Sequence, residues 1–443
     1  MMADEEAKKR TQRPTRARVT MYQVGFGDCF LLSFEYAKAL SDGRKERHIL
    51  VDFGTTYMRE DIRILDIAEA IQRDCNGKLD VVVATHRHKD HISGFSVDKV
   101  TEIMTGLEPD LIVRPWTEDP EARPSAKGHP KERSNRLIES IAQAQAYATA
   151  LHEATGANAR GLRGDLRRNA SGQLPSIESI RLLNSWARKG EGVYLAFGES
   201  SKIERFVPGI TVHVLGPPTI EQWPDLTGER AKDPDYWLAR TDQLTEALGV
   251  AQAGAALPDA VAAISQGYMD GPVRWLIDRM RNQSMNSMMR IVRTLDDALN
   301  NTSLILLFEV RDEKLLFGGD AQIENWSYAL KAPERATKTQ SLLKDVTLYK
   351  VGHHGSRNAT PRTSLFGLWD GAPKRERRIT SLMSTLSGFH GKTEATQVPR
   401  PALVEALKRR THLYSTDELD KETIKIQVET DLQTGEPFAL VKD

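Results

Sequence analysis

The stretch 85-THRHKDHISGF-95 places three histidines and one aspartate within six residues, directly after an apolar run. Alternate residues of an extended segment point to the same side, so His86 and His88 can approach one metal ion together. Asp90 and His91 lie beyond the bend and can face a second ion. Imidazole with carboxylate is a ligand set typical of zinc, and also of manganese or iron. A solvated polar turn is the alternative, but three of the eleven histidines fall within these six residues, which favours a metal site.

Two more stretches carry candidate ligands, and each follows an apolar run. In 315-LLFGGDA-321, Asp320 follows two glycines that let the backbone pass close to an ion, although an ordinary turn aspartate is the alternative interpretation. In 351-VGHHGSR-357, we expect one of His353 and His354 to bind the metal and the other to contact substrate or transfer protons.

Patterns of apolar residues predict a β-rich core formed by the two ends of the chain. Strands are expected at residues 18–24, 29–36, 48–54, 79–85, 303–310, 314–320, 346–352, 379–385, 423–430 and 437–443. Helical spacing predicts helices over 61–75, with Asp61 as the N-cap, and over 400–410.

Residues 116–300 have a different pattern, which is mainly helical and rich in Arg, Gln and Ala. Helices are expected over 131–154, 177–190 and 273–299, with one short strand at 210–218. We interpret this region as an insertion that acts as a cap, a substrate-binding region or a partner-binding region. The predicted organisation is a first half of the core at 18–115, the insertion at 116–300 and a second half of the core at 301–443.

The net charge of the chain predicts no strongly charged partner. The chain has 61 basic and 61 acidic residues, so its net charge favours neither nucleic acid nor an anionic membrane. Two cysteines, Cys29 and Cys75, are too few for a disulfide framework. The sequence has no apolar run near the roughly 18–20 residues of a membrane span, and its N-terminus lacks the apolar segment of a secretory signal. A soluble cytoplasmic protein is expected.

In their order along the chain, the motifs resemble those of the metallo-β-lactamase superfamily, and within it the ComEC-like branch. That branch contains the hydrolase domain of competence DNA-uptake proteins and soluble, free-standing relatives, which this chain resembles. The double-histidine form HHGS favours this branch over the antibiotic-cleaving one. The matching stretches are 22-YQVGFGDCFLLSF-34, 49-ILVDFGTT-56, the His86–His91 motif, 300-NNTSLILLFEV-310, 317-FGGDA-321 and 348-LYKVGHHGSRNAT-360.

The resemblance implies an α+β fold, a four-layer αββα sandwich with a large helical insertion, and a site at one edge across the ends of both sheets. It implies two divalent metal ions that hold a bridging hydroxide, with zinc favoured and manganese or iron as alternatives. The implied ligands are His86 and His88 for the first ion, Asp90, His91 and either His354 or His353 for the second, and Asp320 between the two.

Other residues receive roles from the same resemblance. Asp52 is expected to orient a ligand from behind, whereas Asp28 is expected to form a turn. The candidate catalytic residues are Asp90, His353 and His390. His390, in 386-LSGFHGKTEAT-396, falls where related sequences carry a Gly-His-Pro element, and it can serve as a substrate contact or a general acid.

The sequence departs from the superfamily pattern at the first ion. Many members supply a third histidine from a Gly-His segment between the first motif and the aspartate strand. Here the intervening histidines are His129, His152 and His213, of which only His129 follows a glycine, and none is assigned. A substrate oxygen or water is the alternative donor. The remaining His48 and His412 are expected at the surface.

The expected activity is that of a metal-dependent hydrolase, since two ions can activate a water and hold both oxygens of an in-line displacement. Arg87, Lys89 and Lys350 near the ligands, with donors at Gly355 and Ser356, favour phosphate. A phosphodiesterase or nuclease is therefore favoured, although zero net charge weakens the nucleic-acid version. One alternative is a hydrolase of non-nucleotide esters, acyl bonds or phosphocholine-type substrates. Another is an effector or binding module that docks a protein partner through residues 116–300.

Overall fold

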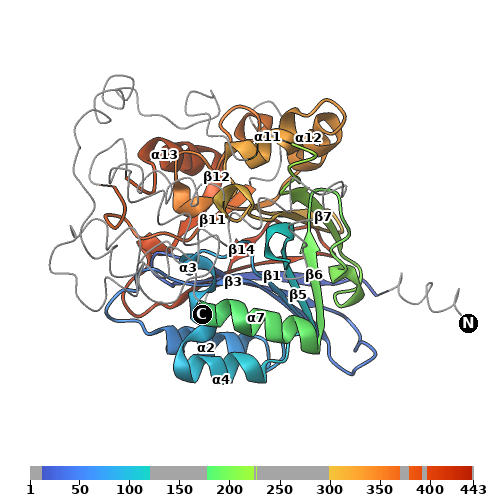
Figure 1. Ribbon diagram of the computed structural model, residues 1–443, viewed down its shortest axis with the longest axis vertical. Helices are drawn as coiled ribbons and strands as arrows, with labels where there is room; N and C mark the ends of the chain where they lie inside the picture. The colour runs from blue at the N-terminus through green and yellow to red at the C-terminus, as the bar shows by residue number, and fades with distance from the viewer. Residues whose placement is uncertain are drawn as a thin grey trace, which may run out of the picture.

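Two mixed β-sheets lie face to face, with helices on the outer face of each, in the computed structural model (Figure 1). The structure describes residues 12–119, 177–223, 226, 299–369, 379–391 and 397–441. The fold class is therefore α+β, as predicted.

One sheet has eight strands and joins the start of the chain to its end. Its order is β14 (Ala439–Leu440), β13 (Lys425–Asp431), β1 (Arg16–Tyr22), β2 (Cys29–Glu35), β3 (Glu46–Phe53), β4 (Val81–Val83), β5 (Leu111–Pro115) and β6 (Glu191–Leu195). Neighbouring strands from β14 to β3 are antiparallel, and those from β3 to β6 are parallel. Its outer face packs against α2 (Ile64–Asp74), α4 (Asp98–Gly106) and α7 (Ile177–Lys189).

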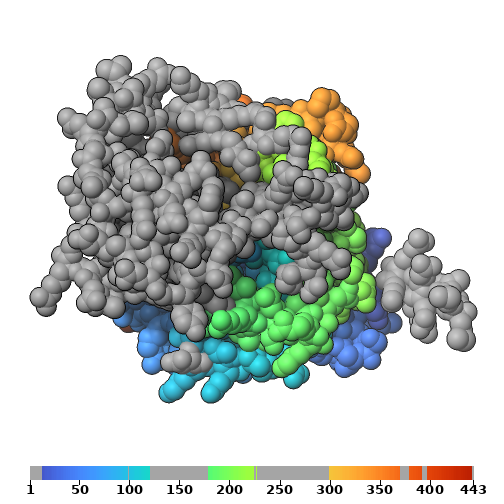
Figure 2. Space-filling model, in the orientation of Figure 1, coloured from blue at the N-terminus to red at the C-terminus, as the bar shows by residue number. Residues whose placement is uncertain are grey.

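The other sheet has six strands and comes mostly from the second half of the chain. Its order is β12 (Thr411–Ser415), β11 (Ile379–Met383), β10 (Leu348–Lys350), β9 (Glu313–Phe317), β8 (Ile305–Val310) and β7 (Thr211–Gly216). The strands from β12 to β9 are parallel, and β9, β8 and β7 form an antiparallel series. Its outer face packs against α11 (Ile323–Lys331), α12 (Ala336–Lys344) and α13 (Pro401–Arg410). In the space-filling view, α4 in cyan and α12 in orange lie at opposite edges of the molecule (Figure 2).

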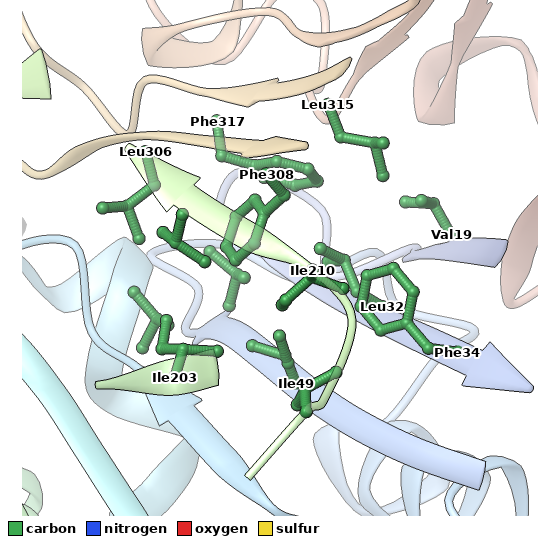
Figure 3. Packing of buried hydrophobic residues seen from close by; sticks show 14 of the residues in the cluster. Val19, Leu32, Phe34, Ile49, Ile203, Ile210, Leu306, Phe308, Leu315 and Phe317 are labelled. Carbon is green, nitrogen blue, oxygen red and sulfur yellow. The ribbon is translucent and has the colours of Figure 1, made fainter. Parts of the chain in front are cut away.

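The main apolar core fills the space between the two sheets. Along β2, Phe30, Leu32 and Phe34 face this core, whereas Leu31 faces the helices on the other side. Because both faces of the sheet are covered, the strand is continuously apolar. Leu32 and Phe34 lie opposite side chains of β8 and β9 such as Phe308 (Figure 3). Full burial of side chains of this size contributes about 1.5–3 kcal/mol each.

The predicted insertion at 116–300 is wrong for residues 177–223. This segment supplies α7, β6 and β7, so it extends both sheets of the core and is not a separate cap. The helix at 177–190 and the strand at 210–218 were predicted from their patterns and are confirmed. The helices predicted over 131–154 and 273–299 lie wholly or almost wholly outside the described residues. The idea that residues 116–300 dock a partner therefore stays a prediction.

Several local predictions need correction. Asp61 does not cap α2, because the helix begins after Arg63, whose backbone N–H donates to Asp66 at 3.0 Å. His48 is buried in β3 and not exposed, while His412 is exposed as expected. Helix α11 was missed because all of its first eight residues, polar ones included, are buried, so no amphipathic period is visible. Among the helices described, none is both long and apolar enough to span a membrane.

Candidate metal centre

The carboxyl ends of several parallel strands meet at one edge of the two sheets. β3 and β4 run parallel in one sheet, and β9, β10 and β11 run parallel in the other. In open sheets of this kind, the carboxyl ends of the strands form the ligand-binding edge. The residues delivered there are Asp52, His86 with the following turn and α3 (Lys89–Ile92), Asp320, His353 with His354, and Ser384.

Four of the predicted ligands form one compact cluster. One ligand atom each from Asp90, His91, Asp320 and His354 lies within 4.8 Å of every other. His91 Nε2 is 3.0 Å from Asp320 Oδ2, and His354 Nε2 is 3.1 Å from Asp90 Oδ2. Two of these residues come from the eight-stranded sheet and two from the six-stranded sheet. The cluster is the set that the resemblance implied for the second ion.

Both histidines of this cluster are oriented from behind. His91 Nδ1 donates to Asp52 Oδ2 at 2.8 Å, and His354 Nδ1 donates to the carbonyl oxygen of Ser384 at 3.0 Å. These bonds leave the Nε2 atoms facing the cluster, which is how metal-binding histidines are commonly held. Asp52 thus lies behind a histidine, where it was expected, and its role in orienting a metal ligand stays a prediction.

The structure also distinguishes the two neighbouring histidines after β10. Both have left-handed backbones, with φ of 47° at His353 and 53° at His354, a conformation that costs energy for residues with a Cβ. The His353 backbone N–H donates to Asp320 Oδ1 at 3.0 Å, which helps to fix this turn. The His354 ring enters the cluster. The His353 ring stays 27% exposed, with Nε2 3.9 Å from Asp320 Oδ2.

His86 and His88 form a second group beside the cluster. His86 Nε2 lies 2.9 Å from His88 Nδ1, and both side chains are buried. Burial lowers the pKa of His88 to about 4, and burial with the neighbouring His91 and His88 lowers the pKa of His86. Both rings are therefore neutral near pH 7, as metal ligands must be. Asn300, to which the sequence analysis gave no role, places Oδ1 3.1 Å from His88 Nδ1.

Asp28 and Lys350 form a buried ion pair behind the centre, which corrects two sequence-based interpretations. Asp28 is not merely a turn residue, because its carboxylate pairs with Lys350 Nζ in the interior. Lys350 also donates to the carbonyl oxygen of Gly319 at 3.1 Å and lies 3.5 Å from Asp320 Oδ1. Burial opposes its charge, but Asp28 and Asp320 raise its pKa overall. Lys350 is thus engaged inside the protein and does not face a substrate phosphate.

Arg87, the other basic residue expected to favour phosphate, is engaged as well. Its guanidinium pairs with buried Glu118 and donates to the carbonyl oxygen of Thr117 at 3.3 Å. The position of Arg87 between two histidines of the first motif is therefore explained by its ion pair with Glu118, without a substrate phosphate.

The charges of the centre fit a bound cation. Among the described residues it gathers the carboxylates of Asp28, Asp52, Asp90 and Asp320, and Lys350 is the one lysine beside them. Burial opposes charge on both His91 and Asp320. The nearby carboxylates nevertheless raise the pKa of His91, and His91 lowers the pKa of Asp320. An uncompensated buried charge is costly. Two nitrogen and two oxygen donors suit zinc, manganese or iron.

The contact between His91 and Asp320 is a second indication of a cation. His91 Nε2 is buried and lies 3.0 Å from Asp320 Oδ2. Together with Asp90 and His354, these two atoms are close enough to bind one common ion.

His390 lies at the rim, within an aromatic cluster formed with Phe26, Tyr57 and Phe389. Its ring centroid is 4.9 Å from Phe26, whose ring is 4.3 Å from that of His354. Tyr57 and Phe389 stack at 5.0 Å and are 46% and 40% exposed. Partial burial, His353 and His354 lower the pKa of His390. The structure thus places His390 beside Phe26, which in turn contacts the His354 ring, and the substrate role of His390 stays a prediction.

The third histidine that many superfamily members carry is not found in the described part of the chain. His213 lies in β7, where its Nε2 contacts Glu309 Oε2 on β8 at 2.8 Å. His129 and His152 lie outside the described residues.

Comparison with known proteins adds no relationship to these observations. No protein-family model matches the sequence, and a search of the curated proteins found no match. The similarity to the metallo-β-lactamase superfamily therefore rests on the motifs quoted above.

Proposed function

We propose that this chain is a metal-dependent hydrolase with the metallo-β-lactamase fold, and that its substrates are phosphodiesters. The observation that carries the proposal is the convergence of Asp90, His91, Asp320 and His354 from two sheets into one cluster of ligand atoms. Divalent ions bound there supply a Lewis acid and lower the pKa of a bound water toward neutrality.

The chain's own residues divide the remaining tasks between them. Asp52 and the Ser384 carbonyl hold His91 and His354 in the tautomers whose Nε2 atoms face the cluster. His353 is partly exposed beside Asp320, so it can donate a proton to a leaving group or contact substrate. His390 and its aromatic neighbours form the adjoining wall on the substrate side.

The choice of phosphodiesters is supported by the family resemblance more than by local charge. Arg87 and Lys350 are paired with Glu118 and Asp28, so neither contributes a free positive charge to a phosphate. The third basic residue expected to favour phosphate is Lys89, at the start of α3, and it takes part in neither of these two ion pairs. The electrostatic support for phosphate is therefore smaller than the sequence suggested.

The exposed aromatic pair favours a second candidate, an ester of a quaternary ammonium alcohol such as a phosphocholine-type substrate. Tyr57 and Phe389 stack within an aromatic cluster that reaches His354 through Phe26. Aromatic faces bind quaternary ammonium groups through cation–π attraction, and they also stack on flat bases. A substrate held against these rings places its ester bond near the cluster.

A substrate panel tests the proposal and separates the candidates. Bis-p-nitrophenyl phosphate, single-stranded DNA, p-nitrophenyl phosphocholine and p-nitrophenyl acetate are assayed with Mn²⁺ or Zn²⁺. We expect diester hydrolysis that falls at least about 100-fold in Asp320→Asn, because a ligand shared by the cluster is lost. Asp80→Asn, which changes a buried carboxylate that pairs with Arg44 elsewhere in the eight-stranded sheet, is the matched control. The proposal is contradicted if the wild-type protein hydrolyses each diester no faster than the Asp320→Asn variant does.

A further inference from the structure

Three donor atoms from separate parts of the chain gather next to the four-residue cluster. Asn300 Oδ1 lies 3.1 Å from His88 Nδ1, and His88 Nδ1 lies 2.9 Å from His86 Nε2. All three side chains are buried. Asn300 is 212 residues from His88 along the sequence, so this contact is created by the tertiary fold.

The fold fixes Asn300 in this position through its neighbours. The backbone N–H of Leu304 donates to the carbonyl oxygen of Thr85 at 2.9 Å, which joins the start of β8 to the histidine turn. Asn325 Nδ2, on α11, donates to the carbonyl oxygen of Ser303 at 2.8 Å. Asn301 Nδ2 lies 3.3 Å from Glu324 Oε2 on the same helix. The segment that carries Asn300 is therefore held between the turn and α11.

The protons of this group can be assigned from the hydrogen bonds behind it. The Thr85 hydroxyl donates to Asp52 Oδ2 at 2.7 Å, so its oxygen is left to accept from His86 Nδ1 at 3.3 Å. With its proton on Nδ1, neutral His86 has a lone pair on Nε2. A single N–H on His88 Nδ1 cannot serve both His86 Nε2 and Asn300 Oδ1 well. A cation, by contrast, accepts all three lone pairs at once.

We propose that Asn300 Oδ1 is the third protein donor to a divalent ion held by His86 Nε2 and His88 Nδ1. It takes the place for which the sequence offers no histidine. The inference rests on the proposed function only in that both require metal at this edge. A neutral amide oxygen is a weaker donor to zinc than an imidazole. This site therefore releases its ion before the site formed by Asp90, His91, Asp320 and His354.

Metal titration of the full chain tests this assignment without reference to activity. Metal-free protein is dialysed against graded free Zn²⁺ and, separately, Mn²⁺, and bound metal is measured by elemental analysis. The wild type is expected to bind two ions with separate dissociation constants. Asn300→Ala raises the weaker constant at least about 10-fold and leaves the tighter one unchanged. Asn300→Asp, which keeps the shape and adds charge, lowers the weaker constant.

Asn301→Ala is the matched control, because the neighbouring residue is also buried but points to Glu324. It should leave both constants as in the wild type. Two results overturn the assignment: both constants unchanged in Asn300→Ala, or one ion at most in the wild type. If Asn300→Ala does not fold, Asn300→Asp decides, and an unchanged weaker constant in that variant overturns the assignment. A wild type that binds two ions but hydrolyses no substrate contradicts the proposed function and leaves the assignment intact.

Discussion

The buried carboxylate of Asp52 contacts His91 directly and reaches His86 through Thr85. Oδ1 accepts from the Thr85 backbone N–H at 2.7 Å, and Oδ2 accepts from the Thr85 hydroxyl at 2.7 Å and from His91 Nδ1 at 2.8 Å. Through Thr85 it also fixes the tautomer of His86. Its backbone φ is 57°, a left-handed value that is costly for an aspartate and that is found most often at functional sites.

Asp52→Asn should weaken metal binding more than it weakens the fold. An amide at this position can present Nδ2 to His91 Nδ1, which favours the tautomer with a proton on Nε2 and removes the lone pair facing Asp320. Loss of such an orienting carboxylate typically lowers metal affinity about 10–100-fold. The dissociation constant for Zn²⁺, measured with a competing chelator, checks this expectation.

Asp80→Asn separates orientation from the loss of a buried charge. Asp80 is also buried, but its carboxylate pairs with Arg44 and accepts from the His48 backbone N–H at 2.7 Å. This variant should lose stability and keep its metal affinity. Equal metal affinity in Asp52→Asn and the wild type would show that Asp52 does not orient a ligand.

His48 makes stability depend on pH at a place remote from the ligands. Burial, with the nearby Arg44, Arg18 and Arg47, lowers its pKa from the ordinary 6.5 to about 3. The unfolded chain therefore binds a proton that the folded chain refuses. Stability is full above pH 6.5 and falls as the pH decreases toward 3, with a loss of about 2 kcal/mol by pH 5 from this group.

His48→Gln should remove this part of the acid sensitivity. Unfolding by urea at pH 8 and pH 5 gives the difference in free energy of unfolding between the two conditions. That difference should be about 2 kcal/mol smaller in the variant than in the wild type. His412→Gln, at an exposed histidine, is the control and should behave like the wild type. A difference that is the same in all three proteins contradicts the burial of His48.

Most residues of the cluster could be named from the sequence because several lie close together in it. The motif from His86 to His91 and the HHGS turn are local patterns. Asn300 and the pairing of Asp28 with Lys350 depend on contacts between distant segments. The choice between His353 and His354 also required structure, because it depends on which ring the turn directs inward.

The turn that carries Asp90 and His91 depends on Gly54 at the end of β3. A Cβ at Gly54 would lie 2.5 Å from the carbonyl carbon of Asp90 and from the backbone nitrogens of His91 and Ile92. The close approach of β3 to α3 therefore requires glycine here. The stretch 54-GTT-56 alone does not reveal that glycine is required, because the steric constraint comes from the backbone at Asp90, 36 residues further along the chain.

Gly54→Ala should displace α3 and damage the four-residue cluster. Overpacking of this kind costs about 1–3 kcal/mol, and Asp90 and His91 move with the turn. Thermal unfolding and Zn²⁺ binding, measured together, should both be impaired. Gly106→Ala, in α4, is the matched control, because a Cβ there meets nothing within 4 Å. A Gly54→Ala protein with wild-type stability and metal affinity would contradict the packing described here.

Strands with long apolar or alternating runs were predicted well, although they are buried, whereas several other elements were not. Strands β1, β2 and β3 alternate or run apolar over seven or eight residues, and their predicted ranges overlap the observed ones. Helix α11 and strand β12 were missed. The buried surface of α11 includes Glu324 and Asn325, so burial there does not follow hydrophobicity.

In the whole molecule, the four candidate ligands come from segments that follow strands of both sheets. Asp90 and His91 follow β4 of the eight-stranded sheet, while Asp320 and His354 follow β9 and β10 of the six-stranded sheet. A bound ion therefore stabilises the sandwich, because it binds the folded chain and not the unfolded one.

Removal of metal should lower the midpoint of thermal unfolding. At an ion concentration 100 times the dissociation constant, bound metal adds about 2.7 kcal/mol to the free energy of unfolding. Differential scanning calorimetry with and without EDTA measures the change. The midpoint of His91→Asn should respond little to EDTA, since a ligand to the tighter site is absent. An unchanged wild-type midpoint contradicts a metal link between the sheets.

The α+β class and a core built from both ends of the chain could be predicted, because apolar strand patterns occur at both ends. The place of residues 177–223 could not. Helix α7 looks like part of a helical region in sequence, and only the pairing of β6 with β5 and of β7 with β8 shows that both sheets continue through it.

Anomalous diffraction from crystals grown with Zn²⁺, recorded on both sides of the zinc absorption edge, shows directly whether the four-residue cluster binds metal. We expect a strong peak at about 2.0–2.2 Å from His91 Nε2, His354 Nε2 and the carboxylates of Asp90 and Asp320. A weaker second peak is predicted at His86, His88 and Asn300. A map with no peak among Asp90, His91, Asp320 and His354, while these side chains keep their positions, would contradict metal binding at this cluster.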